Sequence, residues 1–334
     1  MQKKIIDAKS IKGNILVILP KFIGDAINCS PAIELLKSLY PRKRIFVIAR
    51  PHLVPILERD KSLSIISDDR FKSSHSISLL GFANTLKKKD IELAFILRNS
   101  LSEALLCFLA KVKYRIGYAQ NGRSPFLSHK FKLNKNHHYL YRYCRLITQT
   151  HELMLKEMPS TSLHFQDSLL IEKTSNSINV GLYFGGKNKK NRHYPNDLAA
   201  TAIEKIAANN PNIHFILIGD PTEKKDSELL IEELNNPKIK IRNLVGETSI
   251  VEMLDLIGSL NLLVTIDSGP MHIAAAAGIP FVAIVGLGTS PWSTVAPKQK
   301  NYIPLVANGY QLDEKDIIRD ITPNDICSAV SKLI

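Results

Sequence analysis

The apolar run ILVIL at Ile15–Leu19, followed by PKFIGD at Pro20–Asp25, indicates the fold class of this chain. The run has no alternating polar positions, which is typical of a parallel strand that is buried on both faces. Residues 26–40 then carry apolar side chains at helical spacing, and Pro41 ends that pattern. A buried strand, a short loop and a helix in this order form the repeating unit of a doubly wound α/β fold.

The same unit recurs along the rest of the sequence. In the first half, strands are predicted at 44–49, 63–67, 92–97 and 114–118, and helices at 77–89, 101–112 and 139–149. In the second half, strands are predicted at 178–184, 214–218, 241–245, 262–266 and 281–285, and helices at 197–208, 223–234, 250–260, 270–277 and 323–334. Two such series predict two doubly wound parallel sheets, separated by a linker within residues 157–176. Ligands of these sheets bind outside the carboxyl ends of the strands, so a cleft between two domains is the expected site.

The composition is that of a globular protein with an anionic partner. Hydrophobic residues make up 45% and charged residues 22%, which excludes collagen-like, low-complexity and wholly disordered classes. Lysine and arginine number 44 against 31 aspartate and glutamate, a net charge of +13. That excess favours nucleic acid, a phosphorylated substrate or an acidic membrane surface as partner. The four cysteines form no CxxC pair, so neither a zinc site nor a disulfide framework is predicted.

No targeting or membrane-spanning segment is predicted. Asp7 and Lys9 interrupt the apolar region that a signal peptide needs. The longest apolar stretch, Ile273–Gly288, is shorter than the ~20 residues of a spanning helix, and Pro280 breaks it. We therefore expect a cytoplasmic protein whose membrane contact is at most peripheral.

The loop after the first strand is the first candidate site. Gly24 permits a tight turn into the helix, and Asp25 follows it at the carboxyl end of the strand. Asp25 is either a functional carboxylate or only the N-cap of the helix, and the residues alone favour the cap. A GxGxxG motif is missing after this strand, which argues against a dinucleotide-dependent oxidoreductase.

Two loops of the second half form candidate anion sites. A strand leads into Gly185, Gly186 and Lys187 and then through further basic residues to Arg192, so backbone N–H groups and cations can surround a diphosphate. A solvated basic loop is the alternative. The sequence DSGPMH at Asp267–His272 opens an alanine-rich helix whose N-terminus also suits a phosphate. Within it, His272 is either a residue of that site or a satisfied buried histidine.

A fourth candidate is a stretch of one charge. Residues 104–151 contain no acidic residue, and aromatic residues are interleaved with the cations. The basic residues are Lys111, Lys113, Arg115, Arg123, Lys130, Lys132, Lys135, Arg142 and Arg145. The stretch fits a nucleic acid, a phosphorylated glycolipid or an anionic membrane, with a solvated face as the alternative.

Together these segments resemble the heptosyltransferases of lipopolysaccharide core synthesis, glycosyltransferase family 9, over nearly the whole chain. The resemblance rests on Gly24-Asp25 with Pro31-Ala32 after the first strand, and above all on the Asp267–His272 signature with the small residues that follow. The blocks at Asn99-Ser100 and Arg115–Tyr118 are more similar to the heptosyltransferase II branch than to the heptosyltransferase I branch.

The resemblance implies a GT-B fold, in which two Rossmann-like domains face a central cleft. It assigns residues 1–165 to acceptor binding and residues 176–318 to the nucleotide-sugar, and it suggests that a helix at 319–334 packs back on the first domain. The implied reaction is an inverting transfer of heptose from an ADP-heptose donor to the lipopolysaccharide inner core, a phosphorylated lipid A-core acceptor at the inner membrane face. The residues contain no carboxylate pair that demands a metal, and the basic residues could replace one, so neither a metal nor a cofactor is expected.

The resemblance also implies roles for individual residues. Asp25 matches the family's proposed catalytic base. Arg192 stands where the family commonly has a phosphate-binding lysine, and Glu223 matches a residue that contacts the donor nucleoside. The implied donor set is Gly185, Gly186, Lys187, Arg192, Glu223, Asp267, Ser268, Gly269 and His272. We expect the acceptor to contact Lys21, Arg123, Lys130 and Lys132.

Two other functions stay open at this point. One is a nucleotide-sugar epimerase built on the same two-domain fold, which would need no acceptor. The other is a nucleic-acid-binding protein, which the charge suggests but which leaves the Asp267–His272 signature unexplained.

Overall fold

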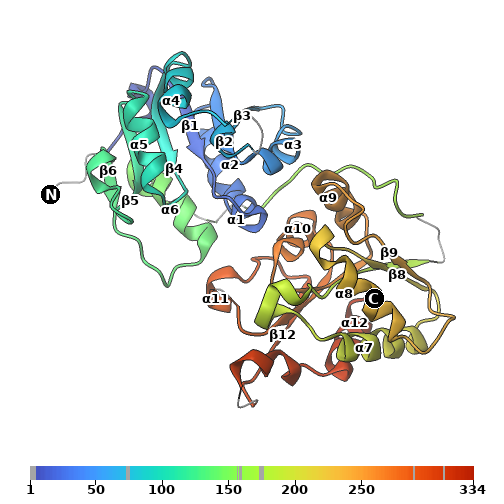
Figure 1. The fold of residues 1–334 in the computed structure, drawn as a ribbon. Coiled ribbons are helices and arrows are strands. Elements are labelled where there is room, and N and C mark those ends of the chain that lie inside the picture. The colour runs from blue at the N-terminus through green and yellow to red at the C-terminus, as the bar shows by residue number, and fades with distance from the viewer. Residues whose placement is uncertain are drawn as a thin grey trace. The chain divides into compact units, whose positions relative to one another are not determined.

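A computed structural model, drawn in Figure 1, describes residues 5–72, 76–155, 157, 160–172, 177–288, 290–310 and 313–334. Residues 158–159 and 173–176 of the expected linker therefore lie outside the described residues. The chain divides into two compact units, Met1–His164 and Phe165–Ile334, and each is built around its own sheet.

The first unit contains a six-stranded sheet in the order β3-β2-β1-β4-β5-β6, with every pair parallel. Its strands are β1 (Asn14–Ile18), β2 (Ile45–Ala49), β3 (Leu63–Ser67), β4 (Ile91–Ile96), β5 (Tyr114–Tyr118) and β6 (His129–Phe131). Strand β1 pairs with both β2 and β4 and is almost wholly buried, as its unbroken apolar run predicts.

The helices of the first unit are α1 (Ile23–Asn28), α2 (Ser30–Leu39), α3 (Val54–Leu57), α4 (Leu79–Lys87), α5 (Leu101–Leu109) and α6 (Tyr139–His151). Short 3-10 helices lie at Ala8–Ser10, Pro51–Leu53, Asp69–Phe71 and Ser124–Phe126. The single helix predicted over 26–40 is wrong in two respects. The helical segment starts earlier, at Ile23, and it is broken at Cys29. Pro31 has no N–H for the carbonyl of Ile27, and the hydroxyl of Ser30 donates to that carbonyl instead.

The second unit repeats the arrangement with a parallel sheet in the order β12-β11-β10-β7-β8-β9. Its strands are β7 (Ile178–Tyr183), β8 (Ile213–Leu217), β9 (Ile241–Asn243), β10 (Leu262–Ile266), β11 (Phe281–Val285) and β12 (Tyr302–Val306). Its helices are α7 (Asn196–Asn209), α8 (Lys224–Glu232), α9 (Ile250–Gly258), α10 (Gly269–Ala277), α11 (Trp292–Val295) and α12 (Pro323–Leu333). The 3-10 helices lie at Lys187–Arg192, Pro221–Glu223 and Glu314–Asp320.

The final helix, α12, belongs to the second unit. It contacts α7 and strands β10, β11 and β12. Its buried stripe of Ile326, Ala329 and Val330 supplies the apolar face for this packing, and Tyr194 donates a hydrogen bond to the carbonyl of Ile321 just before it. This is a different place from the sequence-based expectation, which has residues 319–334 packing on the first domain.

Both sheets have the same chain order, counted from the first strand of each unit. In both, the strand order reverses between two central neighbours, β1 and β4 in the first unit and β7 and β10 in the second. Doubly wound sheets bind ligands beyond the carboxyl ends of the strands at such a reversal. The loops that follow these four strands are therefore where a site is expected.

Candidate active site

Two loops that the sequence singles out separately lie together at the reversal point of the second sheet. Strand β7 leads into Gly185–Arg192 and its parallel neighbour β10 leads into Asp267–Gly269. Arg192 Nη1 donates a hydrogen bond to the backbone carbonyl of Asp267 at 3.2 Å. The structure thus brings the two predicted anion-binding loops to one edge.

Helix α10 presents its N-terminus at this edge. Ser268 is the N-cap, Pro270 lies in the first turn, and no side chain in the described part of the chain caps the helix. The first backbone N–H groups of α10 can therefore bind an anion, and the helix dipole favours one there. His272 lies one turn further on and is buried, with 8% of its surface exposed.

The Asp267 carboxylate lies beside this helix start. Burial raises its pKa, and the charge of Arg192 acts in the opposite direction. A Cβ atom at Gly288 would lie 3.0 Å from Asp267 Oδ2, so the glycine lets the loop after β11 approach the carboxylate.

Glycine is required in the loop after β7. Gly185 has φ +69°, in the left-handed region. A Cβ atom at Gly186 would lie 2.6 Å from Asp226 Oδ2, and the backbone N–H of Lys187 donates to that same oxygen at 2.9 Å. The Lys187 side chain itself is exposed. The diglycine therefore holds the basic loop against helix α8.

Glu223 is buried, with 3% of its surface exposed, and its carboxylate already has partners in the protein. Tyr183 donates its hydroxyl to Oε1 at 3.1 Å, and the backbone N–H of Asp220 donates to Oε2 at 3.0 Å. Lys189 Nζ lies 3.3 Å from Oε1. Glu223 thus links the loops after β7 and β8, and its contact with a nucleoside stays a prediction.

In the first unit, Asp25 lies in the first turn of α1, at the carboxyl end of β1. The N-cap is Phe22, whose side chain makes no capping hydrogen bond, so the alternative that Asp25 is the N-cap is wrong. Burial raises the pKa of Asp25 to about 6, and the charge of Arg142 on α6 acts against that rise. A half-buried carboxylate with such a pKa at a strand end is a candidate general base.

A basic pocket of about 770 Å³ opens at the same end of the first sheet. It is built from the loops that follow β1, β2 and β3, and its lining residues are Lys21, Phe22, Arg50, Pro51, His52, Phe71 and Lys72. The Arg50 guanidinium stacks on the Phe71 ring, and Lys21 Nζ lies 4.5 Å from the centre of the Phe22 ring. Cations supported by aromatic rings suit an anionic ligand with apolar surface.

A buried ion network supports one wall of this basic pocket. Arg70 bonds to Asp68 at 2.8 Å and to Glu103 at 2.5 Å, and Arg98 bonds to Glu103 at 2.9 Å. The side chains of Asp68 and Glu103 are each 1% exposed. With Arg50 included, the cluster contains three guanidinium groups and only two carboxylates. Burial and the nearby charge of Arg98 lower the pKa of Arg50.

The surplus cation of this cluster is Arg50. Its Nε is buried and has no hydrogen-bond partner among the described residues. A buried N–H donor without a partner is costly, and an anion at the pocket would satisfy it. Arg50 is therefore the side chain in the first unit whose contacts best indicate an anionic ligand.

Arg123 is not a surface cation, which corrects its predicted place among acceptor contacts. It is fully buried and donates to the carbonyls of Tyr118 at 2.6 Å and Arg98 at 2.6 Å, and to Asn99 Oδ1 at 2.7 Å. Burial lowers its pKa to about 10. Arg123 thus holds the loop after β4 in place instead of facing a ligand.

Lys130 and Lys132 are exposed, at or beside the edge strand β6. Neither is among the residues that line the basic pocket, whereas Lys21 is. The structure therefore separates the four predicted acceptor contacts into one pocket residue, one buried structural arginine and two edge lysines.

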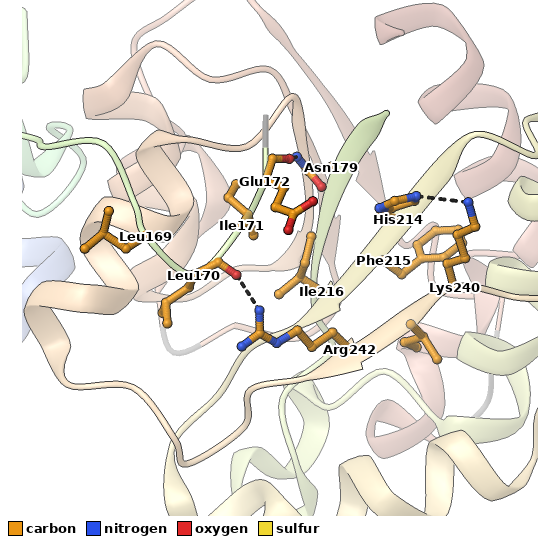
Figure 2. Close-up of a pocket in the computed structure, with 11 residues that line it drawn as sticks. Leu169, Leu170, Ile171, Glu172, Asn179, His214, Phe215, Ile216, Lys240 and Arg242 are labelled. Carbon is orange, nitrogen blue, oxygen red and sulfur yellow. Dashed lines mark hydrogen bonds between the residues drawn. The ribbon is translucent and has the colours of Figure 1, made fainter. Parts of the chain in front are cut away.

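A second cavity, of about 410 Å³, lies elsewhere in the second unit (Figure 2). It is formed by residues 169–172 and by strands β7, β8 and β9, with Arg242 donating to the carbonyl of Leu170 at 2.6 Å and Lys240 lying 3.3 Å from His214. None of the predicted site residues lines it, and it includes the early residues of β7 and β8 instead of the loops at their carboxyl ends.

Among the described residues, no group of three or more His, Cys, Asp and Glu side chains could hold a metal ion. Every helix in this part of the chain is too short or too polar to span a bilayer.

The family model described as glycosyltransferase family 9 (heptosyltransferase) matches residues 79–317, more than half of the chain. The chain belongs to this family. Family 9 membership agrees with the full-length relatives: lipopolysaccharide heptosyltransferase 2 of Salmonella typhimurium is 25% identical, with 96% of this chain and 98% of the relative covered.

Solved structures of family 9 proteins share the fold. The structure of E. coli ADP-heptose lipopolysaccharide heptosyltransferase II has a TM-score of 0.82 at 23% identity, covering 96% of this chain and 98% of that one. E. coli heptosyltransferase WaaC with ADP-2-deoxy-2-fluoro heptose has a TM-score of 0.70 at 15% identity, covering 96% and 100%. The GT-B fold expected from the sequence is confirmed.

For this family 9 glycosyltransferase, sequence reasoning missed the basic pocket apart from Lys21. Arg50 and His52 follow a predicted strand, and Phe71 and Lys72 follow another, so each occupies the kind of position that drew attention to Asp25. Their positions just after strand ends could have predicted the pocket, because ligands of such sheets bind there. The residues come from separate loops, however, and no sequence motif connects them.

Proposed function

We propose that this chain transfers heptose from ADP-heptose to the inner core of lipopolysaccharide, with inversion at the anomeric carbon. The acceptor in this proposal is a Kdo- and heptose-bearing lipid A core, met at the inner face of the cytoplasmic membrane by peripheral contact. Family membership supports the reaction class, and the names of the full-length relatives support the donor and the acceptor.

In this proposal residues 176–318 bind the donor. The N-terminus of α10 at Ser268 and Gly269 and the guanidinium of Arg192 take the diphosphate, since they lie at one edge and offer N–H donors and positive charge. Gly185, Gly186 and Lys187 form the adjoining loop. Asp267, His272 and Glu223 complete the proposed donor set around these groups.

Residues 1–165 bind the acceptor in this proposal. The basic pocket offers Lys21, Arg50 and Lys72 to the phosphates and acidic sugars of the core, and Phe71 offers an apolar face to a sugar ring. Lys130 and Lys132 act at most as long-range attraction for an anionic acceptor, because they do not line the pocket.

The chemistry then needs one base and one stabilised leaving group. Asp25 takes the proton of the acceptor hydroxyl as its oxygen attacks the anomeric carbon, and ADP leaves from the opposite side. With a pKa of about 6, Asp25 is mainly ionised at neutral pH yet basic enough for this transfer. Arg192 and the N–H groups of α10 stabilise the negative charge that develops on the diphosphate.

The observation that carries the proposal is the junction at the second reversal point, where Arg192 bonds to the carbonyl of Asp267 beside the uncapped start of α10. The test incubates the purified chain with ADP-heptose and a deacylated core acceptor. We expect ADP release only when acceptor is present, and a product heavier by one heptose.

Two control arms of that test separate the other functions. An epimerase would convert the nucleotide-sugar without acceptor, and a nucleic-acid-binding protein would release no ADP. A thermal-shift panel of ADP-, GDP- and UDP-sugars checks the donor. Stabilisation by GDP- or UDP-sugars and not by ADP-sugars would contradict the proposed donor.

A further inference from the structure

Helix α5 is apolar on nearly every face, although one face is exposed. Its sequence is LSEALLCFL, and its inner side packs into the core through Ala104, Leu106 and Cys107. Its outer side presents Leu101 and Phe108, which are 43% and 48% exposed. A helix that is hydrophobic all round is normally covered on every side by protein or lipid.

The neighbouring helix α4 extends this apolar surface. Helices α4 and α5 lie side by side on the first sheet (Figure 1). Leu80, in the first turn of α4, is 61% exposed, and Ile77 just before the helix is 38% exposed. We define the α4–α5 surface by its exposed or half-buried apolar residues, which are Ile77, Leu80, Leu101, Leu105 and Phe108.

Cations border the α4–α5 surface. Lys87 and Lys88 end α4 and are exposed, and Lys111 and Lys113 follow α5 and are exposed too. The guanidinium carbon of Arg115 lies 5.5 Å from the centre of the Phe108 ring.

Acidic groups near the α4–α5 surface are few and mostly paired. Glu103 is buried in the ion network, and Glu92 pairs with Lys113 at 3.2 Å. Asp90, just after α4, is exposed and is outnumbered by the lysines. An apolar stripe bordered by basic residues matches a bilayer that carries anionic headgroups.

The α4–α5 surface reaches the carboxyl edge of the first sheet. Both helices start after strand ends, so Leu80 and Leu101 in their first turns lie toward the carboxyl edge of the first sheet. The basic pocket opens at that same edge. A membrane contact here would place the pocket close to headgroup level.

We propose that the α4–α5 surface docks on an anionic phospholipid bilayer, inserting Leu80, Leu101 and Phe108 among the headgroups while the flanking lysines contact the phosphates. The link to a lipid-anchored acceptor rests on the proposed function. The membrane contact itself does not, because vesicle binding is measured without any sugar transfer.

The test measures flotation of the full chain with vesicles of phosphatidylethanolamine and phosphatidylglycerol. The double variant Leu80→Gln/Phe108→Gln should partition about tenfold more weakly or worse, because two exposed apolar anchors are lost. The control is Leu169→Gln, since Leu169 is fully exposed in the second unit. The control should bind like the wild type.

A charge series provides a second arm. The triple variant Lys87→Gln/Lys88→Gln/Lys111→Gln should lose about tenfold or more in binding to these vesicles, since each cation near an anionic surface contributes a severalfold effect. Binding to phosphatidylcholine vesicles should be weak for wild type and variant alike. The matched control is the triple variant Lys205→Gln/Lys225→Gln/Lys332→Gln, on α7, α8 and α12 of the second unit, which should bind like the wild type.

Wild-type flotation by both the double and the triple variant would overturn the proposal. A wild-type dimer that the double variant dissociates, with vesicle binding unchanged, would also overturn it and identify an interface between copies. Melting temperature and turnover on the deacylated acceptor check the fold. If the double variant melts at a lower temperature than the wild type, vesicle binding of Leu80→Gln alone and of the lysine variants decides.

Vesicle binding without any heptose transfer would contradict the proposed function and would leave the proposed docking surface supported.

Discussion

The two units of this glycosyltransferase have the same strand order but carry opposite chemistry at their reversal points. The first has a half-buried carboxylate at Asp25 and, at the same end of the sheet, a pocket of cations and aromatic rings. The second has a glycine loop, an arginine and an uncapped helix start. Since the sheets share one topology, the loops alone decide which unit can supply a base and which can bind a diphosphate.

The largest expected effect comes from removing the base of the first unit. Asp25→Asn should lower kcat by ~10²-fold or more and leave the Kd for ADP-heptose unchanged, because a positioned base acts only in the transition state. Glu34→Gln, which removes a surface carboxylate on α2, is the control. Steady-state kinetics and donor titration measure both quantities, and a wild-type kcat for Asp25→Asn would eliminate the base assignment.

A pair of arginine variants tests whether the two units divide the substrates. Arg192→Ala should reduce kcat/KM for the donor by ~10–10²-fold, since a charge-assisted contact to the diphosphate is lost. Arg50→Ala should raise the acceptor KM by about tenfold and spare the donor KM. Initial rates with each substrate varied in turn give these values. If both variants changed the kinetic constants of the same substrate, the proposal that one unit binds the donor and the other the acceptor would be wrong.

The pH dependence of the reaction should report Asp25. Protonated Asp25 cannot accept a proton, so kcat/KM should fall about tenfold for each pH unit below the pKa of about 6. A pH–rate profile measures this fall.

The raised pKa of Asp25 in the folded protein also affects stability. The free energy of unfolding should decrease as the pH rises from the ordinary aspartate range through 6, because the unfolded chain releases this proton more readily. Asp25→Asn should therefore be more stable than wild type by about 1–3 kcal/mol at neutral pH, and equal to it in acid. Denaturant titrations at two pH values measure this difference, and a less stable Asn variant would contradict it.

Variants within residues 104–151 should distinguish an arginine that stabilises the fold from lysines that act only as surface charge. Arg123→Met leaves several buried carbonyls without their donor and should cost about 2–4 kcal/mol of unfolding free energy. Lys130→Gln/Lys132→Gln should keep wild-type stability and raise the acceptor KM only about twofold, an effect that salt removes. Chemical denaturation and acceptor kinetics at two salt concentrations decide. A stable Arg123→Met variant would contradict the structural assignment.

The smallest expected effect is that of a chelator. Arg192 and the α10 N–H groups can stabilise the leaving diphosphate by themselves, so EDTA should leave the rate unchanged. Loss of activity that magnesium or manganese restores would show that the second unit works with a metal.

Most strands could be predicted because buried parallel strands are short, unbroken apolar runs, as at Leu262–Ile266. Two of the four edge strands, β6 and β12, were missed for physical reasons. Strand β6 carries His129 and Lys130, and β12 contains Pro304, so neither has the apolar pattern of a central strand. Edge strands tolerate both features because one side of the strand needs no partner.

The residues of the candidate site could be predicted only where a sequence motif contains them. Asp25 and the Asp267–His272 signature lie next to glycines at strand ends, and Arg192 ends the basic loop that Gly185 and Gly186 begin. The structure places all three at a reversal point. Charge counting failed for Arg123, because a sequence shows how many cations a segment has and not which of them fold inward. The cluster around Arg50 depends on tertiary contacts with Phe71 and Arg98, which local patterns do not encode.

The placement of α12 has a consequence for recombination between relatives. Because the last helix packs on α7 and β11, every strand and helix from Phe165 to Ile334 belongs to one unit. A single crossover between His164 and Phe165 therefore exchanges one unit intact, whereas a helix returning to the first unit would require two crossovers. New pairings of sugar donor and acceptor could then arise by joining halves of two genes once, without rebuilding either core.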